Sequence, residues 1–517
     1  MKQVLHIFRK DVRHFWKEIG LWLAVLVAFT WNAPRSWQPE PNYGDFVARF
    51  IYPVLLVLLL VVWWFLIARI VQDESLVGDR QFWITRPVEW KKLLIAKLIL
   101  LFLFIHVPLF ISQCVTLWRA GFSPLMSVSG LVWMQLMLLA TLVLAAFALA
   151  AVTSTIAQVI LACVAVVLYM VGLDALDSVV PNNSTLVGNS DNWQFLVFVV
   201  ACIAVVIIQY ASRRSTVSRF SLTAAALLIA LIDVGTPYGK LIAKAYPAET
   251  GSELPVKFAF DASQSKAKGL GSDDGKNVQI ELPLLISDIS AGSAIRIEGR
   301  RVFAQSAQGR WDSGWRGGAN LLLPSERNYL INFSMPKRIY EKMHSAPATV
   351  SVQFAISVLR FGKPWEVALE QGDFNVPRVG ICSLVSPGLS SIRCRSPLRK
   401  PNTLLVTSSS TTSTCEIPEE QRPPKDSIAY DLLWRDDSSP ADSGIDPVSD
   451  FTLFLTYRDS MPEPVSRFGP RLCPGTPITL SESSVSGRMR SSLSIPQFSL
   501  DKYRLPTSMT LTIGVPR

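Results

Sequence analysis

The chain has 517 residues, a formal net charge of +10 and a hydrophobic share of 50%. This length gives room for two or more domains. The charge does not indicate nucleic-acid binding, because the polar part of the chain has no stretch in which basic and aromatic residues alternate. Long apolar segments fill the first 240 or so residues and then stop. We therefore predict an α-helical transmembrane domain over residues 1–246, followed by a soluble, β-rich and sandwich-like domain over 247–517.

Residues 1–18 are predicted to form an amphipathic helix. Apolar residues recur there at helical spacing between charged neighbours, an arrangement typical of helices that lie in the lipid headgroup plane. Alternatively, the segment is a basic flank that only sets the orientation of the chain in the membrane. The apolar residues are Val4, Phe8, Val12, Phe15 and Ile19.

Seven apolar segments are candidates for membrane-spanning helices, which need about 20 mostly apolar residues. The first and the last are short and reach across only if flanking residues join them. The segments are Ile19 to Trp31, Val47 to Val71, Leu93 to Trp118, Val128 to Val152, Thr155 to Leu173, Phe195 to Ala211 and Phe220 to Val234.

The distribution of Lys and Arg predicts that the N-terminus is cytoplasmic, since basic residues accumulate on the inner side of membrane proteins. With this orientation, the outer loops before the last span hold only Arg35 and Arg119. Trp31, Trp118 and Trp193 then lie at outer helix ends, as interfacial tryptophans do. Fourteen basic residues lie on the inner side: Lys2, Arg9, Lys10, Arg13, Lys17, Arg69, Arg80, Arg86, Lys91, Lys92, Lys97, Arg213, Arg214 and Arg219.

Seven spans place the C-terminal domain outside the cytoplasm. Lys240 and Lys244 follow the seventh segment and oppose this orientation. If that segment lies flat in the interface, the domain is cytoplasmic instead.

The segment between the second and third spans carries the most specific pattern in the sequence. It contains a charged stretch with Glu74, then Gly78, a short apolar stretch, and a turn marked by Arg86, Pro87 and Val88. It then runs into the next apolar helix through a basic region that includes Lys97. An element of this kind at the cytoplasmic face is suited to dock on a partner and to move two helices together.

This pattern resembles the permease subunits of ABC-2 type ABC transporters, whose second and third helices are joined by a similar loop. The resemblance covers roughly residues 1–235, and its specific part is limited to about 73–98. It implies that two permeases pair in the membrane and bind two cytoplasmic ATPase subunits. The coupling residues it indicates are Glu74, Gly78, Arg86, Pro87, Val88 and Lys97.

The seventh span and the large C-terminal domain depart from the typical six-span member of that family. Another interpretation of the loop is a charged connector that sets topology and has no partner.

The fourth and fifth spans are separated only by Thr153 and Ser154, which predicts a tight helical hairpin. Ala146, Ala150 and Ser154 form a row of small residues that permits close helix packing. His106 lies in the third span, two residues before Pro108. It either senses substrate or protons, or donates to a carbonyl that the proline leaves without its usual donor.

From residue 247 onward, alternating patterns bounded by Gly, Pro, Ser and Asp predict strands, in one or two modules. The two segments Thr407 to Thr414 and Arg435 to Pro447 are predicted to be exposed loops. The predicted strands include Val278 to Leu282, Ala294 to Phe303, Val350 to Val358, Phe451 to Tyr457 and Met509 to Val515.

Four cysteines of this half are compatible with two disulfides in an oxidising compartment, with three pairings open, or with free thiols. They are Cys382, Cys394, Cys415 and Cys473.

No enzymatic site is predicted in this chain. The string from Gly271 to Asn277 lacks the spacing and the Ser or Thr of a P-loop, so the ATPase that the resemblance implies, with its bound ATP, is expected on a separate partner subunit. His344, the single histidine of the β-rich half, is predicted to be a surface residue. No metal site or other cofactor site is indicated.

These patterns together predict a permease subunit of an ABC-2 type exporter in a bacterial inner membrane, with a periplasmic β-rich domain. Its expected partners are a cytoplasmic ATPase, a second permease and the lipid bilayer. The alternative is a membrane-anchored, extracytoplasmic binding or scaffold protein without transport.

Overall fold

The computed structural model describes residues 2–37, 46–73, 89–179, 189–235, 238–248, 256–264, 267, 276–324, 326–385, 390–398, 403–409, 428–433, 445–457 and 470–506. The chain divides into two compact units. Unit 1 comprises Met1–Ala175, Asn189–Asp233 and Trp365–Leu480, and unit 2 comprises Leu176–Gly188, Val234–Pro364 and Ser481–Arg517. Unit 1 therefore combines apolar helices with a β-rich segment from later in the sequence, which we call the docking module (residues 365–480).

Five apolar helices of the described chain are long enough to cross a membrane: Phe50–Gln72, Trp90–Arg119, Leu125–Val152, Trp193–Ser212 and Ser215–Ile232. They are formed by the elements α3 (Phe46–Gln72); α4 (Trp90–Leu101), η4 (Phe102–His106) and α5 (Val107–Arg119); η5 (Leu125–Ser127), α6 (Val128–Leu138), η6 (Leu139–Val143) and α7 (Leu144–Val152); α9 (Asn189–Ser212); and α10 (Ser215–Gly235). The first and fifth predicted segments also form helices, α2 (Trp16–Asn32) and α8 (Ile156–Val179).

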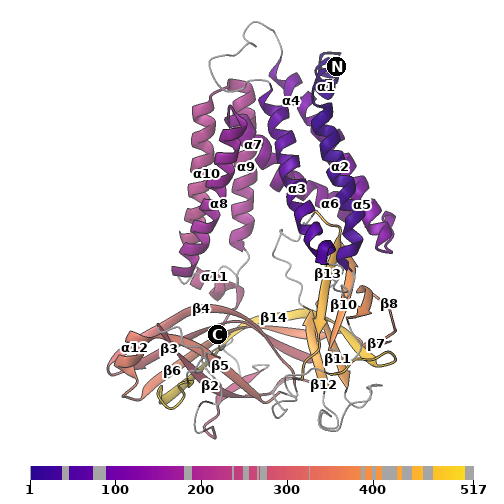
Figure 1. The fold of residues 1–517 in the computed structure, drawn as a ribbon. Coiled ribbons are helices and arrows are strands. Elements are labelled where there is room, and N and C mark those ends of the chain that lie inside the picture. Colours follow the sequence, from indigo (N-terminus) through magenta and orange to yellow (C-terminus); the bar gives the residue numbers. More distant parts are fainter. Residues whose placement is uncertain are drawn as a thin grey trace, which may run out of the picture. The chain divides into compact units, whose positions relative to one another are not determined.

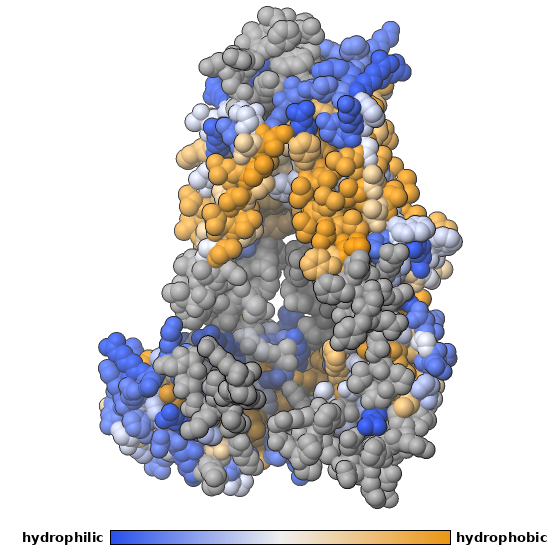
Figure 2. Space-filling model, in the orientation of Figure 1, coloured by the Kyte–Doolittle hydropathy of each residue, from blue (hydrophilic) through white to orange (hydrophobic). Residues whose placement is uncertain are grey.

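Each long helix turns one face to its neighbours and another to the outside. On α3, Leu59, Trp63, Leu66 and Ile70 recur at helical spacing and are fully buried. The opposite face of α3 exposes apolar side chains, including Phe50, Val54, Val57 and Val61. Figure 2 shows such apolar residues in orange over the helices. An exposed apolar surface of this kind is suited to lipid rather than water.

The N-terminal helix α1 (Lys2–His14) ends earlier than the predicted helix over residues 1–18. The chain bends at Phe15, and α2 begins at Trp16. Hydrogen bonds from the Phe15 N–H to the Asp11 carbonyl and from the Ile19 N–H to the Phe15 carbonyl continue across the bend. The side chain of Phe15 is fully buried, so the bend points an aromatic ring into the bundle.

The predicted helical hairpin is confirmed, since α7 ends at Val152 and α8 begins at Ile156. Ala146 and Ala150 are buried, and α7 contacts both α3 and α9. Small side chains at these two positions permit close packing, whereas Ser154, the third residue of the predicted row, is exposed.

The docking module contains antiparallel strands, which Figure 1 draws in orange and yellow. One sheet has the order β13-β10-β9-β8, β11 pairs with β12, and β7 pairs with the start of β14. The strands are β7 (Trp365–Ala368), β8 (Asp373–Val376), β9 (Gly380–Leu384), β10 (Ser391–Pro397), β11 (Leu404–Ser409), β12 (Ile428–Leu433), β13 (Val448–Phe454) and the first four residues of β14 (Pro477–Phe498), whose remainder belongs to unit 2.

Unit 2 contains two further antiparallel arrangements, β1-β2-β5 and β14-β6-β3-β4. Apolar side chains of both, among them Ile280, Phe333, Val302 and Phe354, share one core. Strand β5 alternates exposed and buried residues along its whole length, as a strand with one face on a core does. The elements are α11 (Tyr238–Ala245), β1 (Lys257–Phe260), β2 (Asn277–Ser287), β3 (Ser293–Ser306), β4 (Gly309–Leu322), β5 (Asn328–Pro336), α12 (Lys337–Met343) and β6 (Ala348–Phe361).

The predicted strands at 278–282, 294–303 and 350–358 are confirmed within β2, β3 and β6. The strand predicted over Phe451 to Tyr457 begins earlier and ends earlier, as β13. Met509 to Val515 lies outside the described residues.

Candidate functional site

The structure describes only the residues at the two ends of the predicted coupling segment. Glu74, Gly78, Arg86, Pro87 and Val88 lie outside the described residues. The described chain stops at Asp73, directly after α3, and resumes at Glu89, directly before α4. The site is therefore defined here by the residues around these two ends.

Lys97, the last residue of the predicted motif, is completely buried and forms an ion pair with Asp11 of α1. Its Nζ lies 2.9 Å from the Asp11 Oδ2, and both side chains are 0% exposed. Removing one partner of such a pair leaves the other charge buried without compensation, at a cost of about 3–5 kcal/mol. The pair therefore fixes α1 against α4.

Asp11 was not among the sequence candidates, although a signal was present. It is the single acidic residue in the first seventeen, within a segment that is otherwise basic. An isolated acidic residue in an amphipathic basic helix is a candidate for pairing with a lysine inside an apolar helix, and Lys97 is such a lysine.

The other described end of the coupling segment also lies against α1. The Asp73 carboxylate is 3.8 Å from the Lys10 Nζ and 3.5 Å from the His14 Nε2. These groups are partly exposed, so each pair contributes little to stability by itself. Together with the buried pair, they connect α1 to the end of α3 and to α4, the two helices that flank residues 74–88.

The apolar face of α1 packs on the bundle. Phe8 stacks on Phe104 with 6.2 Å between the ring centroids, and Val12 packs against the same core. Arg9 and Arg13 remain exposed on the other face. The helix is amphipathic as predicted, but protein side chains rather than lipid headgroups receive part of its apolar face.

The hairpin between α7 and α8 is tied to the same end of α3. Gln72 donates from Nε2 to the Thr153 Oγ1 at 3.0 Å, and Arg219 donates from Nη2 to the Val152 carbonyl at 3.0 Å. The end of the bundle that carries Asp73 and Thr153, which we call the basic end, is thus a connected polar layer.

A second polar group lies within the spans. The His106 Nδ1 is 2.8 Å from the Gln135 Oε1, and the Gln135 Nε2 is 2.7 Å from the Gln113 Oε1. His106 is 7% exposed and Gln113 is 1% exposed. His106 is the last residue of the π-helical turn η4. Gln135 lies in α6, four residues before the π-helical turn η6. Such turns are often found at functional sites.

Pro108 leaves the Phe104 carbonyl without its usual helical donor, and Trp22 supplies the replacement. Pro108 has no N–H to donate to the carbonyl four residues before it. The Trp22 Nε1 donates to this carbonyl at 2.9 Å. His106 therefore does not play the packing role that the sequence suggested, and donates to Gln135 instead.

The opposite end of the spans receives the docking module. We call its contact residues, Leu398 and Ile445–Val448, the docking tip. Tyr52, near the start of α3, donates from its hydroxyl to the Asp446 Oδ2 at 2.7 Å. Gln113, in the middle of α5, donates to the Ile445 carbonyl at 3.0 Å.

The docking tip is continuous with the apolar core of the helices. Ile445 and Val448 belong to the same buried cluster as the bundle residues, and Leu398 packs against it. A Cβ added at Gly130 of α6 would clash with the Leu398 Cδ1. The prediction that Arg435 to Pro447 is an exposed loop is thus wrong for its last residues, because apolar helix ends cover Ile445.

Burial raises the pKa of Asp446, and the hydrogen bonds from Tyr52 and from the Val448 N–H oppose this effect. The neighbouring carboxylate of Asp450 raises the pKa further. A buried carboxylate with neutral donors is a pH-sensitive contact.

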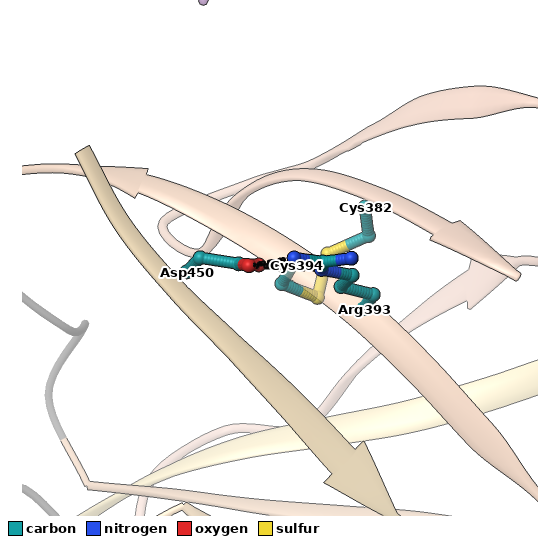
Figure 3. Close-up of a disulfide and its surroundings, with 4 residues drawn as sticks. All are labelled: Cys382, Arg393, Cys394 and Asp450. Atoms are coloured by element: carbon teal, nitrogen blue, oxygen red, sulfur yellow. Dashed lines mark hydrogen bonds and ion pairs between the residues drawn. A yellow bond between two sulfur atoms is a disulfide. The ribbon is translucent and has the colours of Figure 1, made fainter. Parts of the chain in front are cut away.

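A disulfide joins Cys382 of β9 to Cys394 of β10, which are directly paired in the sheet. Figure 3 shows this bond beside Arg393, which donates from Nε to Asp450 at 2.9 Å. Cys473 is also disulfide-bonded, and Cys415 lies outside the described residues. Disulfides persist mainly in oxidising compartments.

Among the described residues, no cluster of three or more His, Cys, Asp or Glu side chains could hold a metal ion. His344 is half-buried and stacks on Tyr340 at 5.1 Å between ring centroids. No protein-family model matches the sequence, and the search of curated proteins finds no match.

Proposed function

We propose that this chain is the permease subunit of an ABC-2 type transporter, which couples ATP hydrolysis on a separate subunit to export. The observation that carries the proposal is the buried Asp11–Lys97 pair. It attaches the basic helix α1 to α4, the helix that follows the coupling segment 74–88.

The arrangement supports force transfer. A partner that pushes on residues 74–88 acts on Asp73 and Glu89, and thus on the ends of α3 and α4 together. Because α1 contacts both ends, it would move with them as one cytoplasmic element. Packed helices joined by ion pairs can transmit a partner's conformational change when the partner favours one of two arrangements.

The placement proposed for the chain is a bacterial inner membrane, crossed seven times, with the N-terminus cytoplasmic and the sandwich-like β domain periplasmic. Three features support this topology: the basic residues at the basic end, the docking tip at the opposite end of the spans, and the Cys382–Cys394 disulfide. A second permease and two ATPase subunits would complete the transporter.

The test is co-purification in mild detergent from membranes of the source cells. The proposal predicts an ATP-hydrolysing partner in the complex, which Glu74→Ala or Pro87→Ala releases. Glu341→Ala is the matched control, because Glu341 is an exposed residue of α12 in unit 2. A stable, ATPase-free chain, or a complex that both loop variants leave intact, would contradict the proposal.

A further inference from the structure

The docking tip and the bundle are joined by one continuous chain of hydrogen bonds. It runs from the Ile445 carbonyl through Gln113 and Gln135 to His106. All four groups belong to unit 1. The chain reaches from the contact with the docking module to a π-helical turn within a membrane-spanning helix.

The Ile445 carbonyl, at the start of this series of hydrogen bonds, fixes which group donates and which accepts in every later bond. A backbone carbonyl can only accept, so Gln113 must present its NH₂ group to Ile445 and its oxygen to Gln135. Gln135 must then present its NH₂ group to Gln113 and its oxygen to His106. The proton of a neutral His106 ring is thereby held on Nδ1.

Without the Ile445 carbonyl, this constraint disappears. Both glutamine amides can rotate by 180° and reverse the polarity of the chain. His106 would then accept at Nδ1 and carry its proton on Nε2. The Nε2 atom is buried and has no hydrogen-bond partner among the described residues, so nothing else in the described chain fixes the ring.

We propose that the docking module is a lid seated on the bundle, and that Gln113 and Gln135 transmit its seating to the ring of His106. The Tyr52 hydroxyl holds the tip by its hydrogen bond to Asp446. The side chain of Leu398 occupies the space that is free because Gly130 has no Cβ. When the lid is lifted, the His106 ring and its π-helical turn lose their fixed partner. The proposal does not depend on the ATPase partner, so failure of the transporter assignment leaves it testable.

Two readouts on the full chain in lipid nanodiscs test the lid. Hydrogen exchange at Ile445, Asp446 and Val448, the residues of 445–448 that carry an amide proton, reports seating. The ¹⁵N shifts of the imidazole nitrogens report the position of the His106 proton. The His106→Asn variant assigns the His106 signals. In the unchanged protein we expect slow exchange and a proton on Nδ1.

Gly130→Trp places an indole where Leu398 sits, and should unseat the tip while Gln113, Gln135 and His106 keep their own side chains. Exchange at 445–448 should rise at least about tenfold, which corresponds to 1.4 kcal/mol. The Nδ1–H signal of His106 should be lost at the same time. Gly20→Trp is the control, because nothing lies within 4 Å of a Cβ built there.

Two further variants keep the test decisive if Gly130→Trp fails to fold. Gln113→Leu should raise exchange at the tip about fivefold, the effect of losing one buried hydrogen bond, and should release the His106 proton. Gln135→Leu should release the proton while the tip stays protected. Gln158→Leu, at the basic end, should change neither readout.

Two results would overturn the proposal. Rapid exchange at 445–448 in the unchanged protein, or unchanged exchange in folded Gly130→Trp, would show that the tip is not seated on the bundle. An Nδ1–H signal that persists in Gln135→Leu or in an unseated variant would show that seating is not transmitted to His106.

Discussion

At the residue scale, two contacts are most informative: the Asp11–Lys97 ion pair at one end of the bundle and the Tyr52–Asp446 hydrogen bond at the other. Lys97 was predicted to belong to the coupling motif, and the structure places it in a fully buried ion pair with Asp11. The sequence could indicate a functional role for Lys97, since it is the last residue of the predicted motif. The isolated acidic Asp11 was a signal for a partner, but the sequence could not establish the contact, because residues 86 positions apart meet only through tertiary packing.

Replacing Lys97 by Met should destabilise the protein by about 3–5 kcal/mol, since it leaves the Asp11 carboxylate buried and unpaired. The double variant Asp11→Leu/Lys97→Met should recover most of this loss, because a buried pair exchanged for apolar residues of similar size is often neutral. Thermal unfolding in detergent measures both. A single variant as stable as the unchanged protein would contradict the buried pair.

The Asp446 contact should depend on pH. Because burial raises the pKa of Asp446 in the seated state, the seated tip binds a proton more readily than the lifted tip. Seating should therefore be strongest at mildly acidic pH and weaken as pH rises through the raised pKa. Tyr52 and Asp450 are the titratable groups identified as acting on this carboxylate.

The measurement is hydrogen exchange at 445–448 between pH 5 and 8, corrected for the intrinsic pH dependence of exchange. Asp446→Asn should remove the dependence. A dependence of the opposite sign, or one that persists in Asp446→Asn, would assign it to another group.

At the scale of elements, the helices and strands followed from periodicity far better than their ends did. Continuous apolar runs predicted α3 and α9, and alternation predicted β2, β3 and β6. The bend at Phe15 and the two π-helical turns had no periodic signal, because they depend on contacts from distant residues. Phe15 enters the bundle core, and the carbonyl at the Pro108 break is satisfied by Trp22 from another helix.

Trp22→Phe should destabilise the bundle by about 1–3 kcal/mol more than a matched Trp→Phe change, because it leaves the Phe104 carbonyl without a donor. The match is Trp63, which is equally buried and whose indole N–H has no hydrogen-bond partner among the described residues. Thermal unfolding of Trp22→Phe and Trp63→Phe compares the two. Equal losses would show that the indole hydrogen bond contributes nothing.

At the scale of the whole molecule, the sequence predicted a membrane-embedded helical part and a β-rich part. It did not predict that residues 365–480 group with the helices, because the docking tip is short and lies in a segment rich in Asp, Ser and Pro. The burial of Ile445 depends on helix ends that only the fold brings together. The pairing of Cys382 with Cys394 likewise required the register of β9 and β10.

The proposed topology predicts which positions a membrane-impermeant thiol reagent reaches in intact cells. Ser484→Cys, on an exposed part of β14, should be labelled from outside, and Lys17→Cys, at the basic end, only after permeabilisation. Both are made in a background without Cys114, Cys163 and Cys202, the free thiols among the described residues. Labelling of Ser484→Cys only after permeabilisation would place the β-rich domain in the cytoplasm.

The transporter proposal requires that an ATP-hydrolysing partner binds residues 74–88 and pushes on them. The most direct test places a photo-activatable cross-linking residue at Glu74 or at Gly78 and irradiates intact cells. We expect a cross-linked partner that binds an ATP analogue, and no such product from the same group at Glu341. Cross-links that never contain an ATP-binding protein would contradict the claim and would leave the helices as an anchor for the β-rich domain.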